Sequence, residues 1–363
     1  MVSSEALKVI QREGLSPPEI LTIAITGACN LTCRHCWVRS GEPSAAGHLP
    51  ERTVRRLVEE FMALGGEGVR FTGGEPLCHP AWLKLLQFGR SLGLGTVAIQ
   101  TNGMLFTDDM VAALRDLAFP QLSLQISLDG ATAASHDAVR GEGAFAGTMT
   151  GLRRLVKGGL GRQVQLFCTE MRHNLQEIPD LLRLADQLGL GSVKTGALVR
   201  CGRAEEETGL ESPDLADYQQ LLQRYDADPE FQALYERLGT VAAIEWRQEE
   251  APRNECCTFV RNPYLTATGR LYPCVLCHAD EYAVTGVLGK NLAAAFAEGA
   301  PRWRSLLELS LARAASLTSC RDCPGRDLCA GGCLGRAWAS CGDFSAADDR
   351  CQIRRAIYDS SQK

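Results

Sequence analysis

Three closely spaced cysteines constrain this chain more than any other feature. Cys29, Cys33 and Cys36 lie in the sequence CNLTCRHC, directly after residues 20–25 (ILTIAI), an apolar run that predicts a buried strand. Thiolates are soft ligands that suit iron–sulfur clusters and zinc. A closed zinc site uses four ligands, whereas three cysteines on a [4Fe-4S] cube leave one iron without a protein ligand. We therefore favour a cluster with an open iron, with zinc or structural thiols as the alternatives.

A second motif falls where the next strand is expected to end. Residues 69–76 read VRFTGGEP, a strand that runs into a glycine-rich turn. Glycine lets a backbone approach a ligand closely, and exposed amides in such a turn can meet a polar ligand group. The candidate binding residues in this turn are Gly73, Gly74, Glu75 and Pro76.

With both motifs in this order, the chain resembles the radical S-adenosylmethionine (SAM) superfamily. That family is marked by CxxxCxxC after its first strand and GGEP after its second. The resemblance implies that Cys29, Cys33 and Cys36 hold a [4Fe-4S] cluster and that the amino and carboxylate groups of SAM chelate the open iron. It also implies that the GGEP turn lies along the SAM amino group.

The composition fits a globular protein. The 363 residues are enough for one large domain and a smaller one. A net charge of -5 and a pI near 5.8 give no reason to expect nucleic acid or an anionic membrane as a partner. No apolar run approaches the roughly 18 residues of a membrane span, and residues 1–8 carry no export signal. We expect a cytoplasmic protein. Because disulfides are rare in the cytosol, the 16 cysteines favour metal or cluster ligation.

From residue 20 to about 200 the pattern alternates between strands and helices, which predicts a parallel α/β sheet with crossover helices. We expect a tail or short helix at 1–18, then a barrel domain at 19–239. Amphipathic helices are expected at 51–64, 82–92 and 175–188, and further helices at 212–224 and 229–238. Six units of one strand followed by one helix fit the partial, TIM-like (β/α)6 barrel of the radical SAM family. Strands are expected to start near Ile20, Gly68, Gly95, Gln121, Val164 and Ser192.

Two further motifs follow the expected third and fourth strands, at the edge of the sheet where barrel chemistry is found. TNG at 101–103 follows the third, and SLDG at 127–130 continues to HDAVRG at 136–141. By the resemblance, Ser127 and Arg140 contact the ribose and carboxylate of SAM, and a guanidinium fork suits a carboxylate. The structural alternatives are a helix cap by Asp129 and an ion pair of Arg140. The other candidate cofactor contacts are Asn102 and His35.

Ten of the cysteines lie between Cys256 and Cys351. Their spacing, a GxxxxC unit at 269–274 followed by CxxCx5Cx3C and a last cysteine, resembles the SPASM domain, which carries auxiliary [4Fe-4S] clusters in radical SAM enzymes. We expect this domain at 240–363. The resemblance implies an outer cluster on Cys320, Cys323, Cys329 and Cys351. It implies an inner cluster on Cys274, Cys333 and one or both of Cys256 and Cys257. Which of that pair ligates, and whether Cys277 or Cys341 adds a ligand, stays open, and two zinc sites are the alternative.

The resemblance implies an enzyme. A flavodoxin- or ferredoxin-type donor reduces the first cluster, SAM is cleaved to methionine and a 5′-deoxyadenosyl radical, and the radical takes a hydrogen atom from the substrate. SPASM enzymes mostly act on peptides. The sulfatase-maturing branch has an aspartate directly after the GxxxxC cysteine, where this chain has Val275, which disfavours formylglycine formation. We therefore expect oxidative modification, such as a crosslink, of a ribosomally made peptide with a leader segment.

Two other functions remain open. One is maturation of a small molecule such as a modified tetrapyrrole, whose carboxylates would call for cavity arginines; Arg200, Arg203 and Arg270 are the candidates. The other is a non-catalytic electron-transfer protein, which the intact SAM motifs disfavour.

Overall fold

The computed structural model describes residues 2–42, 47–253 and 260–361. In this part of the chain, nine strands form one open sheet in the order β7-β6-β5-β4-β3-β2-β1-β8-β9. The first seven are parallel neighbours in chain order, β8 runs parallel to β1 on its other side, and β9 is antiparallel to β8. The strands are β1 (Ile20–Thr26), β2 (Gly68–Gly73), β3 (Thr96–Thr101), β4 (Gln121–Ser127), β5 (Val164–Glu170), β6 (Ser192–Ala197), β7 (Gly239–Thr240), β8 (Tyr264–Leu265) and β9 (Leu271–Tyr272).

The expected α/β architecture is confirmed: the sheet curves as a partial barrel and does not close. Five of the six expected strand starts are correct, and β3 starts at Thr96, one residue after the expected position. The two-residue strand β7 was not predicted, because so short a segment carries no periodic pattern.

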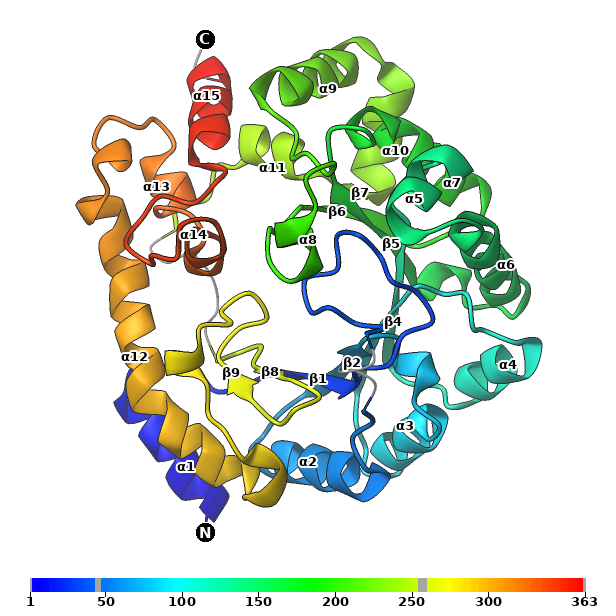
Figure 1. Ribbon diagram of the computed structural model, residues 1–363, viewed down its shortest axis with the longest axis vertical. Coiled ribbons are helices and arrows are strands. Elements are labelled where there is room, and N and C mark those ends of the chain that lie inside the picture. The colour runs from blue at the N-terminus through cyan, green and yellow to red at the C-terminus, as the bar shows by residue number, and fades with distance from the viewer. Residues whose placement is uncertain (1, 43–46, 254–259, 362–363) are drawn as a thin grey trace.

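Helices cover the outer face of the curved sheet (Figure 1). The helices of the barrel region are α2 (Glu51–Ala63), α3 (Trp82–Ser91), α4 (Asp108–Asp116), α5 (Ala133–Arg140), α6 (Ala144–Lys157), α7 (Ile178–Gln187), α8 (Arg203–Glu206), α9 (Leu215–Ala227) and α10 (Pro229–Leu238). The short helix α8 is the exception, because it lies toward the centre of Figure 1. The remaining helices are α1 (Val2–Arg12), α11 (Ala242–Gln248), α12 (Leu292–Ser316), α13 (Arg326–Cys329), α14 (Leu334–Cys341) and α15 (Cys351–Ser361).

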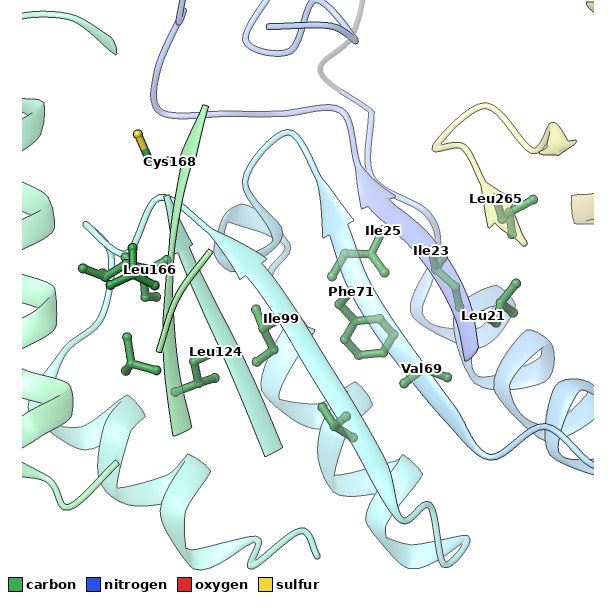
Figure 2. Packing of buried hydrophobic residues seen from close by; sticks show 14 of the residues in the cluster. Leu21, Ile23, Ile25, Val69, Phe71, Ile99, Leu124, Leu166, Cys168 and Leu265 are labelled. Atoms are coloured by element: carbon green, nitrogen blue, oxygen red, sulfur yellow. The ribbon is translucent and has the colours of Figure 1, made fainter. Parts of the chain in front are cut away.

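The core lies between these helices and the sheet. Because side chains alternate along a strand, one set from each strand faces the helices. Figure 2 shows members of that set on β1 to β5 and on β8, all buried in one cluster. The labelled residues include Leu21, Ile23, Val69, Phe71, Ile99, Leu124 and Leu166. The other face, which we call the inner face, is left for more polar side chains.

Capping residues decide where the helices after the barrel strands begin. The Asp214 carboxylate accepts a hydrogen bond from the backbone amide of Asp217, and the Asp214 amide donates to the Asp217 carboxylate, a capping box that starts α9 at Leu215. The expected start at residue 212 was therefore three residues early. Asp228 caps α10, which spans 229–238 as expected.

The C-terminal third packs onto the barrel. The hairpin β8–β9 extends the sheet beside β1, α12 packs on α1 and α2, and α15 packs on α11 and α9. Figure 1 shows α1 beside α12. One sheet thus runs through both expected domains. No helix in the described ranges is long and apolar enough to cross a membrane.

Candidate functional site

The three N-terminal cysteines lie on the loop that follows β1. The Sγ atom of Cys36 accepts a hydrogen bond from the backbone of Ser40 at 3.4 Å. Arg203, at the start of α8, holds the loop from the other side: its guanidinium donates to the carbonyl of Cys33 at 2.6 Å and to that of Ser40 at 2.7 Å. The loop is therefore fixed by side chains from distant parts of the chain.

Burial and mutual charge act on these thiols together. Burial raises the pKa of Cys29 to about 12, and the charges of Glu75, Cys33 and Cys36 add to the effect. Each of the three sulfurs therefore lies within electrostatic reach of the others. Within the described ranges, no three His, Cys, Asp or Glu side chains are already arranged to hold a metal ion. The donor set is nevertheless all thiol, which suits an iron–sulfur cluster, and a bound metal ion deprotonates a coordinating thiol despite such burial.

The GGEP turn is pressed against the start of the cysteine loop. Gly73 has φ of 145°, and a Cβ there would lie 2.1 Å from the carbonyl oxygen of Thr26. A Cβ on Gly74 would lie 2.2 Å from the carbonyl oxygen of Ala28. The backbone amides of Gly74 and Glu75 donate to those same two carbonyls, each at 2.8 Å. Glycine at both positions is what allows the two motifs to meet.

Glu75 joins the ends of β2 and β3. Its buried carboxylate accepts hydrogen bonds from the Thr101 hydroxyl at 2.6 Å, the Asn102 amide at 2.8 Å and the Leu77 amide at 3.1 Å. Burial raises the pKa of Glu75, and these hydrogen bonds counteract the rise. The Asn102 side chain donates to Asn30 on the cysteine loop at 2.8 Å. Three segments are thus tied together at one edge of the sheet.

A second buried group connects β4 and α5 with the cysteine loop. Arg140 Nε donates to Asp129 Oδ2 at 2.6 Å, and His35 Nε2 lies 3.2 Å from the same oxygen. Arg140 Nη1 lies 3.9 Å from Cys33 Sγ. Burial raises the pKa of Asp129, but the charges of Arg140 and His35 outweigh it and hold that pKa well below its usual range. The ion-pair alternative for Arg140 is therefore what the structure shows, with its Nη atoms left facing Cys33 and His35.

Most of the candidate SAM-motif residues thus come together in one connected network. It contains the cysteine loop with His35, the GGEP turn, Asn102 and Arg140. Ser127 ends β4 at the same edge of the sheet, paired in register with Phe167. Among the described residues no hydrogen bond links Ser127 to the network.

The C-terminal cysteines form a second group. Burial raises the pKa of Cys320, and the charges of Cys351, Cys329 and Cys323 add to it. The other three cysteines expected for the outer cluster therefore lie within electrostatic reach of Cys320, although no three of these four described cysteines are already arranged to hold a metal ion.

The cysteines expected for the inner cluster are less completely described. The backbone of Cys277 donates to the carbonyl of Cys274 at 3.2 Å, and Cys277 is buried, whereas Cys341 is exposed. The amide of Cys333 donates to Asp348 at 2.8 Å. Cys256 and Cys257 lie outside the described residues.

The sequence analysis missed an aromatic group between the two cysteine regions. His278 stacks on Tyr264 at a centroid distance of 5.1 Å and on Tyr272 at 4.9 Å, and Trp37 lies 4.8 Å away. Burial lowers the pKa of His278 to about 4. Trp37 directly follows Cys36, and His278 directly follows Cys277. The group forms only because the β8–β9 hairpin pairs with β1, and no local sequence pattern predicts that pairing.

The three arginines suggested for a carboxylate-binding cavity are engaged elsewhere. Arg200 donates to the carbonyls of Glu207 and Leu210. Arg203 holds the cysteine loop, and Arg270 forms an ion pair with Asp280. None of the three guanidinium groups is therefore left free to bind the carboxylates of a tetrapyrrole, as that hypothesis required.

Comparison with known proteins is consistent with this geometry. Residues 23–185 match the Radical SAM superfamily. An AdoMet-dependent heme synthase of Methanosarcina barkeri is 28% identical over 355 residues, covering 93% of this chain and 97% of that protein. The mycofactocin maturase MftC of Mycobacterium ulcerans is 28% identical over 338 residues, covering 93% of this chain and 89% of that protein.

Solved structures share the fold. Native anSMEcpe with bound AdoMet superposes with a TM-score of 0.75 at 16% identity, covering 95% of this chain and 97% of that one. Streptococcus suis SuiB bound to its precursor peptide SuiA gives 0.74 at 17% identity, covering 96% and 79%. At these identities the likeness establishes the partial barrel and its C-terminal extension, and nothing further.

Proposed function

We infer, from the radical SAM domain that residues 23–185 form, that this protein is an enzyme that uses SAM and a [4Fe-4S] cluster to modify a peptide oxidatively. The observation that carries the inference is the junction of the two motifs. The amides of Gly74 and Glu75 bond to the carbonyls of Thr26 and Ala28, which places the GGEP turn against the cysteine loop.

The residues of this junction have distinct tasks in the proposal. Cys29, Cys33 and Cys36 would hold the cluster, and the GGEP turn with Asn102, Arg140, His35 and Ser127 would hold SAM. When bound, the two cofactors supply reductive cleavage of SAM and the abstraction of a substrate hydrogen atom. Glu75 fixes the turn through three hydrogen bonds. Arg140 keeps a positive charge beside the loop.

The match to MftC supports a peptide as substrate, because it extends over 93% of this chain. The structures of SuiB with SuiA and of anSMEcpe with a Cys-containing peptide show that this fold can hold a peptide in those proteins. Val275 packs against the small apolar cluster that contains Tyr264 and Tyr272. That position therefore offers no carboxylate for formylglycine chemistry.

The second candidate is a maturase of a modified tetrapyrrole. It is favoured by the heme synthase match, which covers 97% of that relative's length at the same 28% identity. Either substrate would use the same SAM site, so the two candidates differ in what the inner face of the sheet binds.

The C-terminal region, with a boundary near residue 240, would carry two auxiliary [4Fe-4S] clusters. The proximity of Cys323, Cys329 and Cys351 to Cys320 supports the outer cluster. The inner cluster would use Cys274, Cys333 and one or both of Cys256 and Cys257, which lie outside the described residues. Cys277 is the better-placed additional ligand, because Cys341 is exposed. Both auxiliary clusters would pass electrons to or from the substrate radical, while a flavodoxin- or ferredoxin-type donor would reduce the first cluster.

The test is an intact mass. The protein is expressed anaerobically together with whatever short open reading frame sits beside its gene, and the encoded peptide is weighed. Loss of two hydrogens per site is expected with the native protein and with Cys201→Ala, and no change with Cys36→Ala. Cys201 is a matched control because it also borders the loop, with Sγ 3.8 Å from the Trp37 carbonyl. An unchanged peptide with native protein that still cleaves SAM would favour the tetrapyrrole candidate.

A further inference from the structure

The inner face of the sheet carries an unusual set of side chains. On β2 to β6, the positions that alternate with the buried core include two cations and several amides and hydroxyls. Neighbouring side chains are hydrogen-bonded across strands: Gln100 to Gln125 at 3.3 Å, and Gln165 to Ser192 at 3.2 Å. Strand alternation places Lys194 on the same face as Ser192. The inner-face positions of β2 to β6 contain no aspartate or glutamate.

Arg70 is the feature of this face that a structural role does not explain. Its Nη1 donates to the Thr22 hydroxyl at 3.3 Å. Among the described residues, no carboxylate lies within ion-pair distance of Arg70 or of Lys194. Burying a charge without a counter-charge is unfavourable, and burial lowers the pKa of Arg70. An unpaired, partly buried guanidinium in a polar interior is therefore a candidate binding group.

A cavity of about 220 Å³ lies against this guanidinium, near the first residues of β1, β3 and β4. It is lined by the polar residues Arg70, Thr96, Gln121, Ser123, Gln125 and Gln165 and by Ile20, Val97, Ala98 and Leu122. Sites for whole drug-sized ligands are roughly 300 to 1,000 Å³, so this cavity suits one arm of a larger molecule. Its lining offers a guanidinium fork, which matches a carboxylate with two parallel hydrogen bonds, and neutral amides that can donate to the same group.

We propose that this cavity is a subsite for a carboxylate of the substrate, held by Arg70, and that Lys194 is a second carboxylate contact nearer the reactive end of the sheet. The subsite deepens the proposed function and rests on it. It is a property of the inner face and not of the SAM site.

The strand register sets the two cations at different depths. Arg70 lies three residues before Gly73, or about 10 Å along the strand from the GGEP turn. Lys194 pairs with Phe167, and Phe167 pairs with Ser127, so Lys194 is level with the SAM-binding edge. A substrate arm whose carboxylate reaches Arg70 therefore extends past the SAM-binding edge of the sheet. The carbon atoms to which that arm is attached would then lie level with the SAM site.

Both candidate substrates carry carboxylates, so the test uses one probe for each. The first probe is coproporphyrin III, a tetrapyrrole with four carboxylates, and its tetramethyl ester is the neutral control. The second is a synthetic peptide with the sequence of whatever short open reading frame sits beside the gene, and the same peptide with its carboxylates amidated is the neutral control. Binding is measured by fluorescence on the anaerobically reconstituted full-length protein, for wild type, Arg70→Gln, Arg70→Lys, Lys194→Gln and Arg115→Gln.

The proposal predicts that at least one acid probe binds the wild type and that Arg70→Gln weakens this binding by about 10- to 100-fold. Arg70→Lys should fall between the two, which separates loss of charge from misfolding. Lys194→Gln should weaken the same probe, and Arg115→Gln, an exposed arginine on α4 that pairs with Asp116, should not. Which acid probe responds identifies the substrate class.

Three results would overturn the subsite: equal affinity of wild type and Arg70→Gln, equal binding of an acid probe and its neutral control, or no binding of either acid probe. SAM cleavage by the wild type is measured in parallel. Its absence would count against the proposed function, whereas the binding data test the inner face alone.

Discussion

Arg140 and Asp129 form a buried ion pair directly beside the cysteine loop, with Arg140 Nε 2.6 Å from Asp129 Oδ2 and side-chain exposures of 9% and 0%. The same aspartate lies 3.2 Å from His35 Nε2 and accepts a hydrogen bond from the amide of Thr169 at 2.8 Å. One carboxylate therefore holds β5, α5 and the cysteine loop in a fixed relation.

Removing that charge should destabilise the protein strongly. Asp129→Asn leaves Arg140 buried without its counter-charge, and breaking a buried pair costs about 3 to 5 kcal/mol. We expect a loss near this size in the free energy of unfolding of the metal-free protein, measured by urea denaturation at pH 7. The control is Asp108→Asn, an exposed partner of Lys157, which should cost less than about 1 kcal/mol. Equal costs would show that the pair does not hold the loop.

The stability of the protein should depend on His136 between pH 4 and 6.5. Its Nδ1 accepts a hydrogen bond from the amide of Asp129, which requires the neutral ring, and burial lowers its pKa from 6.5 to about 4. Between these values the unfolded chain binds more protons, so the stabilisation is complete above pH 6.5 and is lost as the pH falls toward 4.

The contribution of one histidine has a slope of at most about 1.4 kcal/mol per pH unit. His136→Asn keeps an acceptor near the Nδ1 position and removes the titration. Urea denaturation at pH 5 and pH 7.5 should therefore show a smaller difference for the variant than for the wild type. Identical differences would assign the acid sensitivity to other groups.

Gly73 should tolerate no side chain. At φ of 145° a Cβ would lie 2.1 Å from the Thr26 carbonyl oxygen, so Gly73→Ala must separate the two motifs. We expect a loss of more than about 3 kcal/mol in unfolding free energy. Gly65→Ala is the control: φ is 82° and no atom lies within 4 Å of the new Cβ. It should lose only about 1 to 2 kcal/mol. Similar losses would mean that backbone conformation alone, and not the close approach, requires glycine at residue 73.

The four C-terminal thiols should act as one unit. Cys329→Ala should lower the iron content of anaerobically reconstituted protein by about four atoms, because a [4Fe-4S] cluster is held by four cysteines. Cys341→Ala, at an exposed cysteine, should leave it unchanged. Iron and zinc are counted together, since zinc in place of iron would contradict the auxiliary clusters.

Much of the barrel could be predicted from the sequence because its signals are local. Alternating apolar runs mark β1 to β6, and the two motifs follow β1 and β2. The register of Thr22 with Tyr264 could not be predicted. It joins a two-residue strand to one more than 240 positions earlier in the chain, and no periodic pattern specifies such a pairing.

The site could be predicted only in part, because its motifs are local in sequence whereas many of its contacts are not. Glu75 was identified from its motif, but its partner Thr101 depends on the packing of β3 against β2. Arg70 and Lys194 could have been found, since both alternate with buried positions on their strands. Arg200, Arg203 and Arg270 were named as candidates instead, and the partners that engage them are visible only in three dimensions.

The yield of 5′-deoxyadenosine shows directly whether the cluster held by Cys29, Cys33 and Cys36 cleaves SAM. Anaerobically reconstituted protein is given SAM and a strong reductant, and the product is quantified for wild type, Cys201→Ala and Cys36→Ala. We expect 5′-deoxyadenosine from the first two and none above background from the third. Its absence from wild-type protein that holds at least about four irons would contradict the assignment of Cys29, Cys33 and Cys36 to a SAM-cleaving cluster.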